Sequence, residues 1–369
     1  MQPRSTIARL IVYALLFAGA AVFLFPFLWL VCTSLKPIEQ TMSMPPTWLP
    51  RAYYAAIDGK RMEVTRDYPV PDRPGYWHVT ERLPASLSLA GLPAAAGLQT
   101  GVVQHEPVSA IVPAAEIETK IQPRWDNYHT ALATMGGRSR DCGTTDTATG
   151  VGPDTRVSFF TFLRNTLLVC VLGVIGAVFS NALIAYGFAK IRWRGRDTLF
   201  VLTLATMMVP FPVLMVPLYG VFKWLGWIGS LKPLWVPAFF GSAFNIFLMR
   251  QFFRTIPEEL SEAARIDGCS EFGIFWRIIL PLSKPVIAVV ALFHFLWAWN
   301  DFMGPLLYLT RKHTFTLALA LQNYQSQGGG VQWHYLMAAT VVVIIPVVIL
   351  FFLTQKTFIK GIATTGIKG

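Results

Sequence analysis

The residues best suited to interaction chemistry gather in one polar interval, residues 255–285, which has apolar runs of membrane-spanning length on both sides. Five of its charged residues surround a pair of alanines: Glu258, Glu259, Glu262, Arg265 and Asp267. Ala263 and Ala264 leave a patch poor in side chains at which another protein can approach the backbone, and the charges around it can select that partner. The interval therefore predicts a docking surface.

Two short helices are expected to position these charges. Residues Thr255–Glu258 supply a hydroxyl cap, a first-turn proline and a glutamate three residues after the threonine, which together begin a helix. Asp267-Gly268 ends it, because glycine tolerates the left-handed conformation of a helix C-terminus. A second helix is expected over residues 270–279, with Pro281 stopping it. The pair forms an elbow, residues 255–285, that lies outside the bilayer.

Patterns for other chemistry are absent from the sequence. The four cysteines, Cys32, Cys142, Cys170 and Cys269, lack metal-type spacing, and Cys142 has no obvious disulfide partner in its polar region. There is no G-x-x-x-x-G-K-[ST] phosphate loop, so the chain cannot be an ATPase of that type. No nucleophile–base pair or metal cluster points to an enzyme, and no metal or cofactor is expected.

Composition indicates a polytopic membrane protein. Only 14% of residues are charged, 54% are apolar and the mean hydropathy is +0.48. The pI of about 9.6 does not require a nucleic-acid partner. Residues 36–156 hold 12 of the 31 basic and 13 of the 20 acidic residues, so the basic excess belongs to the membrane part of the chain.

Six membrane-spanning helices are expected, near residues 10–32, 159–189, 199–222, 234–253, 286–309 and 335–358. A signal peptide is the alternative for the first; its apolar run is long and no small-x-small cleavage site follows, which favours a retained helix. Pro210, Pro212 and Pro217 should break or bend the third span, which makes it a candidate to line a pathway.

Charge predicts the orientation of these spans. With a cytoplasmic N-terminus, the inner segments hold 14 Lys and Arg residues, while the outer segments apart from residues 36–158 hold five. The positive-inside rule then places both termini and the elbow in the cytoplasm and residues 36–158 outside.

The external region, residues 36–158, is expected to contain a small β-rich subdomain. Residues 52–66 are typical of a hairpin around Asp58-Gly59, and residues 76–80 and 108–112 of further strands. Residues 136–155, rich in Gly, Thr and Asp, are typical of a flexible tether.

The elbow resembles the EAA loop of bacterial ABC importer permeases. It carries Glu262-Ala263-Ala264, then Gly268 after three further residues, Ile278 after nine more, and Leu280-Pro281. In that family the loop is the coupling helix that enters a cleft of the cytoplasmic ATPase. The resemblance therefore assigns ATPase coupling to five residues: Glu262, Ala263, Ala264, Asp267 and Gly268.

Other segments resemble the carbohydrate-importer permeases of this family. Residues 34–50 and 125–132 are similar to two pieces of the external loop that are nearly adjacent in that family; here about 75 residues separate them, so residues 51–124 look like an insertion. The tail, residues 359–369, is also similar. The resemblance implies an all-α membrane protein of the MetI-like type, to which the strand patterns add a small β-rich extracytoplasmic insertion between helices 1 and 2. It also implies four parts: residues 1–35, 36–158, a core 159–358 that includes the elbow, and the tail.

Polar groups at membrane depth are costly, so each needs a partner or a use. The run Trp297–Phe302 and Gly304-Pro305-Leu306 resemble the fifth helix of sugar-importer permeases, where aromatic faces beside amides and a carboxylate suit a sugar. The candidate pathway residues are Trp297, Asn300, Asp301 and Asn245. The alternative interpretation is that the polar groups bond neighbouring helices and the tryptophans form an interfacial belt. For His294 an interhelical hydrogen bond is expected rather than proton relay.

The resemblance implies one permease subunit of an ATP-driven sugar importer in the bacterial inner membrane. Its partners would be a homologous permease, two cytoplasmic ATPase subunits that bind the ATP, an extracytoplasmic sugar-binding protein and membrane lipid. An importer for a polyol or phosphorylated polyol is the alternative within the class. A membrane-anchored enzyme or sensor that uses the external region is the alternative from another class.

Overall fold

The computed structural model describes residues 6–43, 46–57, 59–70, 75–82, 108–135, 157–326 and 332–365. The expected tether over residues 136–155 and Cys142 lie outside these ranges. The chain forms two compact units. Unit 1 comprises Met1–Ala131 and Gln332–Val341, and unit 2 comprises Leu132–Val331 and Val342–Gly369.

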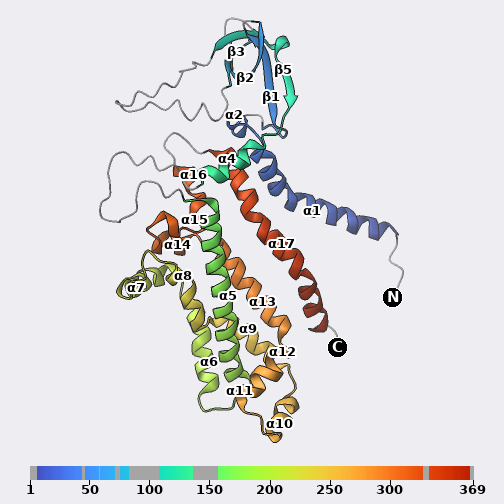
Figure 1. Ribbon diagram of the computed structural model, residues 1–369. Coiled ribbons are helices and arrows are strands. Elements are labelled where there is room, and N and C mark those ends of the chain that lie inside the picture. Colours follow the sequence, from blue (N-terminus) through green and yellow to red (C-terminus); the bar gives the residue numbers. More distant parts are fainter. Residues whose placement is uncertain are drawn as a thin grey trace. The chain divides into compact units, whose positions relative to one another are not determined.

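Unit 1 contains a five-stranded antiparallel sheet of order β4-β3-β2-β1-β5 (Figure 1). Its elements are α1 (Thr6–Ser34), α2 (Ile38–Thr41), β1 (Arg51–Ile57), β2 (Lys60–Pro69), β3 (Tyr76–Glu81), β4 (Ser109–Pro113), the 3₁₀ turn η1 (Ala114–Glu116), β5 (Glu118–Ile121) and α4 (Asp126–Thr134). The expected hairpin and both further strands are confirmed. Strand β5 and helix α4 were not expected from the sequence. One face of the sheet packs a small core: Ala55, Ile57, Val64, Val79 and Val112.

The two ends of the insertion meet at the base of this sheet. Strands β1 and β5 pair, and the Gln122 N–H donates to the Pro50 carbonyl at 3.1 Å. Beyond these strands, the side-chain amide of Asn127 (Nδ2) donates to the backbone carbonyls of Ser34 (2.8 Å) and Lys36 (2.9 Å). The two loop pieces that the insertion separates in sequence are therefore hydrogen-bonded neighbours. The inserted sheet begins and ends at this one hydrogen-bonded junction.

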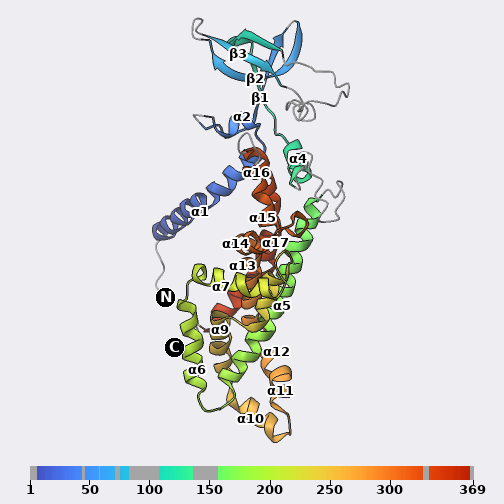
Figure 2. The same cartoon turned by 90° about the vertical axis from the view of Figure 1, so that its left-hand side faces the viewer.

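Unit 2 is helical, with α5 (Phe159–Ala189) packed along α9 (Ala243–Arg254) and α13 (Lys284–Asn300) (Figures 1 and 2). Its other elements are α6 (Arg196–Ala205), η2 (Thr206–Met208), α7 (Phe211–Trp224), α8 (Lys232–Trp235), η3 (Val236–Phe240), α10 (Glu258–Ile266), α11 (Glu271–Ile274), the π-helical η4 (Phe275–Ile279), α12 (Leu280–Leu282), α14 (Met303–Tyr308), η5 (Lys312–Thr314), α15 (Leu317–Leu321) and α16 (Asn323–Ser326). In both views α10 and α11 lie at the end of unit 2 opposite to α14 and α15. Helix α17 (Trp333–Thr365) begins in unit 1 and continues into unit 2.

Three described helices are long and apolar enough to cross a membrane: Ala8–Ser34, Phe159–Ala189 and Trp333–Gln355. The number rises to five if each of two bent pairs, Arg196–Met208 with Phe211–Trp224 and Glu271–Leu282 with Lys284–Asn300, makes one span. The remaining expected span, residues 234–253, is interrupted between η3 and α9. The described residues thus support a helical membrane protein, and the number of six stays a prediction.

The break expected in the third span is confirmed. Helices α6 and η2 meet α7 at 100°, and Pro210 is the N-cap of α7. Pro212 follows within the first turn, where a missing N–H costs little. The two prolines therefore end one helix and begin the next in a new direction.

Polar side chains hold the second interruption against α5. The side-chain Oδ1 of Asn181 accepts the Ser242 N–H at 2.7 Å, and the Ser180 hydroxyl donates to the Ala238 carbonyl at 2.9 Å. These contacts satisfy backbone groups that the break in the helix leaves open. Asn181 of α5 therefore holds the start of α9 by a hydrogen bond between helices.

A close contact between α5 and α13 depends on a glycine. A Cβ at Gly173 would lie 2.6 Å from Nε2 of His294, so any side chain there would require the His294 ring or the helices to shift. Among the described residues Nε2 has no hydrogen-bond partner, and the hydrogen bond expected for His294 is not made at this atom.

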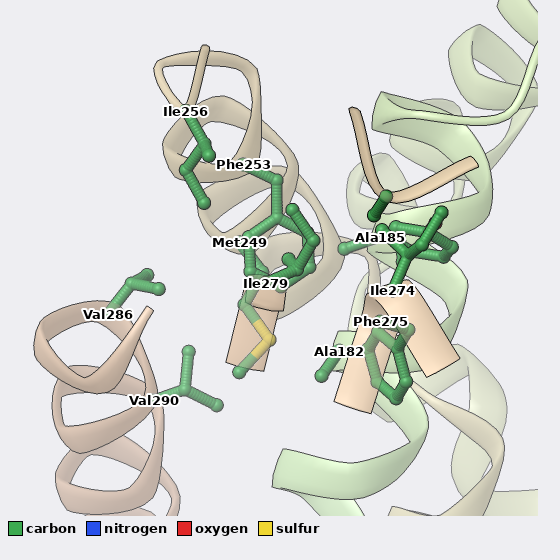
Figure 3. Packing of buried hydrophobic residues seen from close by; sticks show 12 residues of the cluster. Ala182, Ala185, Met249, Phe253, Ile256, Ile274, Phe275, Ile279, Val286 and Val290 are labelled. Atoms are coloured by element: carbon green, nitrogen blue, oxygen red, sulfur yellow. The ribbon is translucent and has the colours of Figure 1, made fainter. Parts of the chain in front are cut away.

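An apolar cluster joins the elbow to the helices (Figure 3). It contains Ala182, Ala185, Tyr186, Met249, Phe253, Ile256, Ala264, Ile274, Phe275, Ile279, Val286 and Val290. Phe275 and Ile279 from η4 meet α5 and α13 residues in this cluster, and Ile256 comes from the connection between α9 and α10. The elbow is therefore packed onto the helical core.

Candidate functional site

Helix α10 begins without the expected threonine cap. Its N-cap is Pro257, which makes no side-chain cap bond, and the Thr255 hydroxyl donates back to the Phe252 carbonyl at 2.7 Å. Thr255 is the C-cap residue of α9, so its hydroxyl is used one helix earlier than predicted. Glu258 and Glu259 instead place negative charge in the first turn, where the helix dipole favours it.

The end of α10 is a Schellman turn, as the glycine predicted. The Cys269 N–H donates to the Ala264 carbonyl (2.9 Å) and the Gly268 N–H to the Arg265 carbonyl (3.0 Å). Gly268 has φ +82°, a conformation that costs other residues about 1–2 kcal/mol. Asp267 is the C-cap residue. Glycine at position 268 thus permits the sharp exit from the helix.

The second helix begins as expected and ends later than expected. The Ser270 hydroxyl caps α11 by accepting the Gly273 N–H at 3.2 Å. Pro281 does not stop the helix: the π-helical η4 passes into α12, and Pro281 occupies its first turn, where no N–H is required. The chain turns at Ser283 instead. The prediction of a stop at Pro281 was wrong because the π-segment changes the hydrogen-bond register before the proline.

The two alanines of the motif face different ways. Ala264 is 7% exposed and belongs to the apolar cluster, and Ser261 of the same helix is fully buried. Glu262, Ala263 and Asp267 are exposed. The accessible patch poor in side chains is therefore centred on Ala263, and Ala264 fixes the face by which α10 packs.

Arg265 connects the two elbow helices. Its Nε donates to Oε1 of Glu271 at 2.7 Å, and its Nη1 lies 3.6 Å from Oε1 of Glu258. The hydrogen bond to Glu271 raises the pKa of the Arg265 guanidinium above its usual value, against a smaller opposing effect of burial. Arg265 therefore stays charged throughout the physiological range.

The polar residues at the end of α13 are used locally. The side-chain amide of Asn300 (Nδ2) donates to the Leu296 carbonyl of its own helix at 2.7 Å. Asp301 follows α13 and accepts the Gly304 N–H at 3.0 Å, which supports the start of α14. Asn300 is exposed and Asp301 half-buried, so both keep oxygen atoms for a further partner.

The other two candidate pathway residues differ in exposure. Trp297 is 59% exposed, with its ring 5.7 Å from the His294 ring, while Asn245 on α9 is 8% exposed. Among the described residues no common hydrogen-bond network joins Asn245 to the residues that end α13. Trp299 is buried and stacks on Phe295, a packing role that neither interpretation gave to this tryptophan.

The sequence analysis missed two residues that contact the elbow, Tyr186 in the last turn of α5 and Lys190, its C-cap residue. The Tyr186 hydroxyl donates to Oε2 of Glu271 (2.6 Å), and Nζ of Lys190 donates to Oε2 of Glu258 (3.1 Å) and to the Ile256 carbonyl (2.7 Å). The available signal was their spacing of four residues, which places both on one face at the end of a span.

Residues 160–364 match the model of a family described as the binding-protein-dependent transport system inner membrane component. The chain is 37% identical over 211 residues to the arabinooligosaccharides transport system permease protein AraQ of Bacillus subtilis, covering 57% of this chain and 74% of that protein. It is 34% identical over 214 residues to the sn-glycerol-3-phosphate transport system permease protein UgpE of Yersinia enterocolitica, covering 58% and 75%.

A solved structure shares the fold over nearly the whole chain. It is described as a bacterial ABC transporter involved in the import of the acidic polysaccharide alginate. The TM-score is 0.62 at 20% identity, and the match covers 96% of this chain and 98% of that chain.

Proposed function

The chain belongs to the family of binding-protein-dependent transport system inner membrane components, and from this premise we propose that it carries a sugar or oligosaccharide into the cell. It is a permease subunit of an ABC importer, a transport component of the inner membrane and not an enzyme. The ATPase of such a system is a separate subunit. The observation that carries the proposal is the elbow, whose spaced motif folds into a helix that ends in a Schellman turn and has an exposed acidic face.

Glu262, Ala263, Asp267 and Gly268 form the proposed docking face for the ATPase. Their exposure at the end of α10 supports this role, since a partner can reach them without disturbing the apolar cluster. Ala264 contributes from the buried side by holding the helix in place. ATP-driven closure of two ATPase subunits would displace the elbow as a rigid body and switch the cavity between a pair of homologous permeases.

The proposed topology has six crossings with both termini and the elbow in the cytoplasm. The interrupted segment α8–η3–α9 is the proposed additional crossing, and its hydrogen bonds to α5 support it, since broken helices are tolerated where neighbours satisfy the backbone. Unit 1 would then present its sheet to the extracytoplasmic sugar-binding protein. The four-part division of the chain, at residues 35, 158 and 358, remains part of this proposal.

The similarity to a glycerol-3-phosphate permease favours a phosphorylated polyol as the second candidate substrate. The proposed pathway residues argue for an uncharged sugar. Trp297, Asn300 and Asn245 offer an aromatic face and amides, and Asp301 adds a carboxylate, whereas a phosphate would require cationic partners. An aromatic ring beside amides and a carboxylate suits the C–H faces and hydroxyls of a sugar.

The test begins with purification of the permease from its native membrane in mild detergent. It should bring down an ABC ATPase and a second permease, and the binding protein of the same system should be screened against neutral oligosaccharides, polyols and glycerol 3-phosphate. Uptake into proteoliposomes should follow the ligand that this binding protein selects. Selection of glycerol 3-phosphate would replace the sugar by the second candidate, and absence of an ATPase would refute the docking role.

A further inference from the structure

Five side chains close a ring between α5 and the elbow. Tyr186 and Lys190 lie four residues apart at the end of α5, and Glu258, Arg265 and Glu271 belong to α10 and α11. The chain of contacts runs from Lys190 to Glu258, to Arg265, to Glu271 and back to Tyr186. The chain of contacts begins and ends on one face of α5, and the helix itself closes the ring.

Each carboxylate of the ring divides its oxygen atoms between α5 and Arg265. Glu271 accepts from Tyr186 on Oε2 and from Arg265 on Oε1. Glu258 accepts from Lys190 on Oε2, while its Oε1 lies near Arg265. Because Arg265 reaches both carboxylates with different nitrogen atoms, its planar guanidinium fixes their separation. Tilting of α10 relative to α5 would break at least one of these contacts.

The ring differs from a set of ordinary surface ion pairs in the burial of one member. The Lys190 side chain is 3% exposed, and Nζ also donates to the Ile256 carbonyl at 2.7 Å. Exposed pairs contribute little, but a buried ammonium that loses its carboxylate is strongly unfavourable. The apolar cluster, with Ala264 and Phe275, packs the elbow against the same part of α5. Charge and packing thus hold the same joint.

We infer that the ring of Tyr186, Lys190, Glu258, Arg265 and Glu271 is a positioning device that makes the elbow and the end of α5 move as one body. The inference rests on the proposed coupling function. The ring does not include Glu262, Ala263 or Asp267, so it acts on the transmission of motion and not on docking. Breaking it leaves the ATPase bound and lets the joint absorb the displacement.

The experiment compares transport per ATP hydrolysed in proteoliposomes that contain the assembled complex. Arg265→Gln removes the central cation, and Tyr186→Phe removes one hydroxyl while the ring stays aromatic. Arg277→Gln is the matched control, since it removes an exposed cation from the same elbow outside the ring. Residues that connect two coupled sites change the coupling by factors of about 2 to 30. We expect a loss of this size for Arg265→Gln, a smaller loss for Tyr186→Phe and none for the control.

Two further measurements separate positioning from simple structural damage. ATPase retention after size-exclusion chromatography should be unchanged in all three variants. The double variant Arg265→Glu with Glu271→Arg, which restores one opposite-charge pair, should recover part of the lost transport per ATP. Lost retention in Arg265→Gln, or no recovery in the double variant, would overturn the positioning role.

Failure of this inference is distinguishable from failure of the proposed function. If Gly268→Leu uncouples transport while Arg265→Gln and Tyr186→Phe behave like Arg277→Gln, the elbow couples without the ring. If none of these variants changes ATPase retention or transport per ATP, the elbow is only a connector, and the proposed docking function fails with the ring.

Discussion

Replacement of Gly268 separates the strain of the turn from the shape of the docking face. With φ at +82°, any residue other than glycine should lower the free energy of unfolding by about 1–2 kcal/mol. The cost is similar for alanine and leucine. A Cβ at this position would meet no atom of the chain within 4 Å. A larger side chain therefore projects into open space, which an ATPase would occupy.

Gly268→Leu and Gly268→Ala should thus have similar thermal stability and different affinity for the ATPase. Overpacking of a fitted surface costs about 1–3 kcal/mol, which corresponds to roughly 5- to 150-fold weaker binding for leucine. Alanine should bind within about threefold of the unmodified protein, since its single methyl group adds little bulk to the strain.

The assay titrates purified ATPase onto the detergent-solubilised permease and follows thermal unfolding of each variant in parallel. Equal weakening by alanine and leucine would show that the turn geometry matters and the accessible surface does not. Unchanged affinity for leucine would refute docking at this end of α10.

Four further predictions use other parts of the chain. Glu262→Lys should insert normally yet bind the ATPase about tenfold more weakly, whereas Lys232→Ala should bind as before; equal binding would remove charge from the docking face. Replacing residues 52–121 by two glycines should leave a complex that assembles and hydrolyses ATP, as native gels and phosphate release report, because the ends of the insertion are already paired; loss of assembly would make the sheet a structural part. In a cysteine-free background, an impermeant maleimide should label intact cells carrying Thr119→Cys and not those carrying Glu262→Cys, and the reverse pattern would invert the topology. The hydrogen bond between Arg265 and Glu271 raises the pKa of the guanidinium and lowers the pKa of the carboxyl, so this pair stays charged at both ends of the physiological range. Transport per ATP should therefore be flat between about pH 6 and 9 once general activity is normalised against Arg277→Gln; a titration specific to the unmodified protein in this range would contradict it.

Features dictated by one residue type were predictable from the sequence. Gly268 and Gly59 occupy the left-handed region that glycine alone enters freely. Gly268 follows the end of α10, and Gly59 lies in the turn between β1 and β2, as expected. Pro210 breaks the third span for an equally local reason, the missing N–H. In these cases the cause lies within a few residues of the effect.

Features that depend on a neighbouring element were not predictable. Thr255 has the chemistry of an N-cap, but its hydroxyl donates to the Phe252 carbonyl at the end of α9 instead. Pro281 is a helix breaker whose effect depends on the register set by η4 before it. Strand β5 is short and exposed, and only its pairing with β1 across the insertion makes it a strand. The candidate pathway residues suffer the same limit, since Asn300 and Asp301 satisfy local backbone groups that the sequence does not reveal.

The charges of the elbow show how far helical spacing alone could have gone. Glu258, Glu262 and Arg265 stand at positions i, i+4 and i+7, so helical spacing places all three on one face of α10. The sequence analysis treated these charges as one docking set, and spacing alone could not have divided it. Spacing also could not reveal which residues contact Glu258 and Glu271, because Tyr186 and Lys190 lie 85 and 68 residues from the carboxylates they contact. The contacts divide these charges by function. Substitution of the exposed Glu262 should change the affinity for the ATPase, whereas substitution of Arg265 in the ring should change transport per ATP hydrolysed.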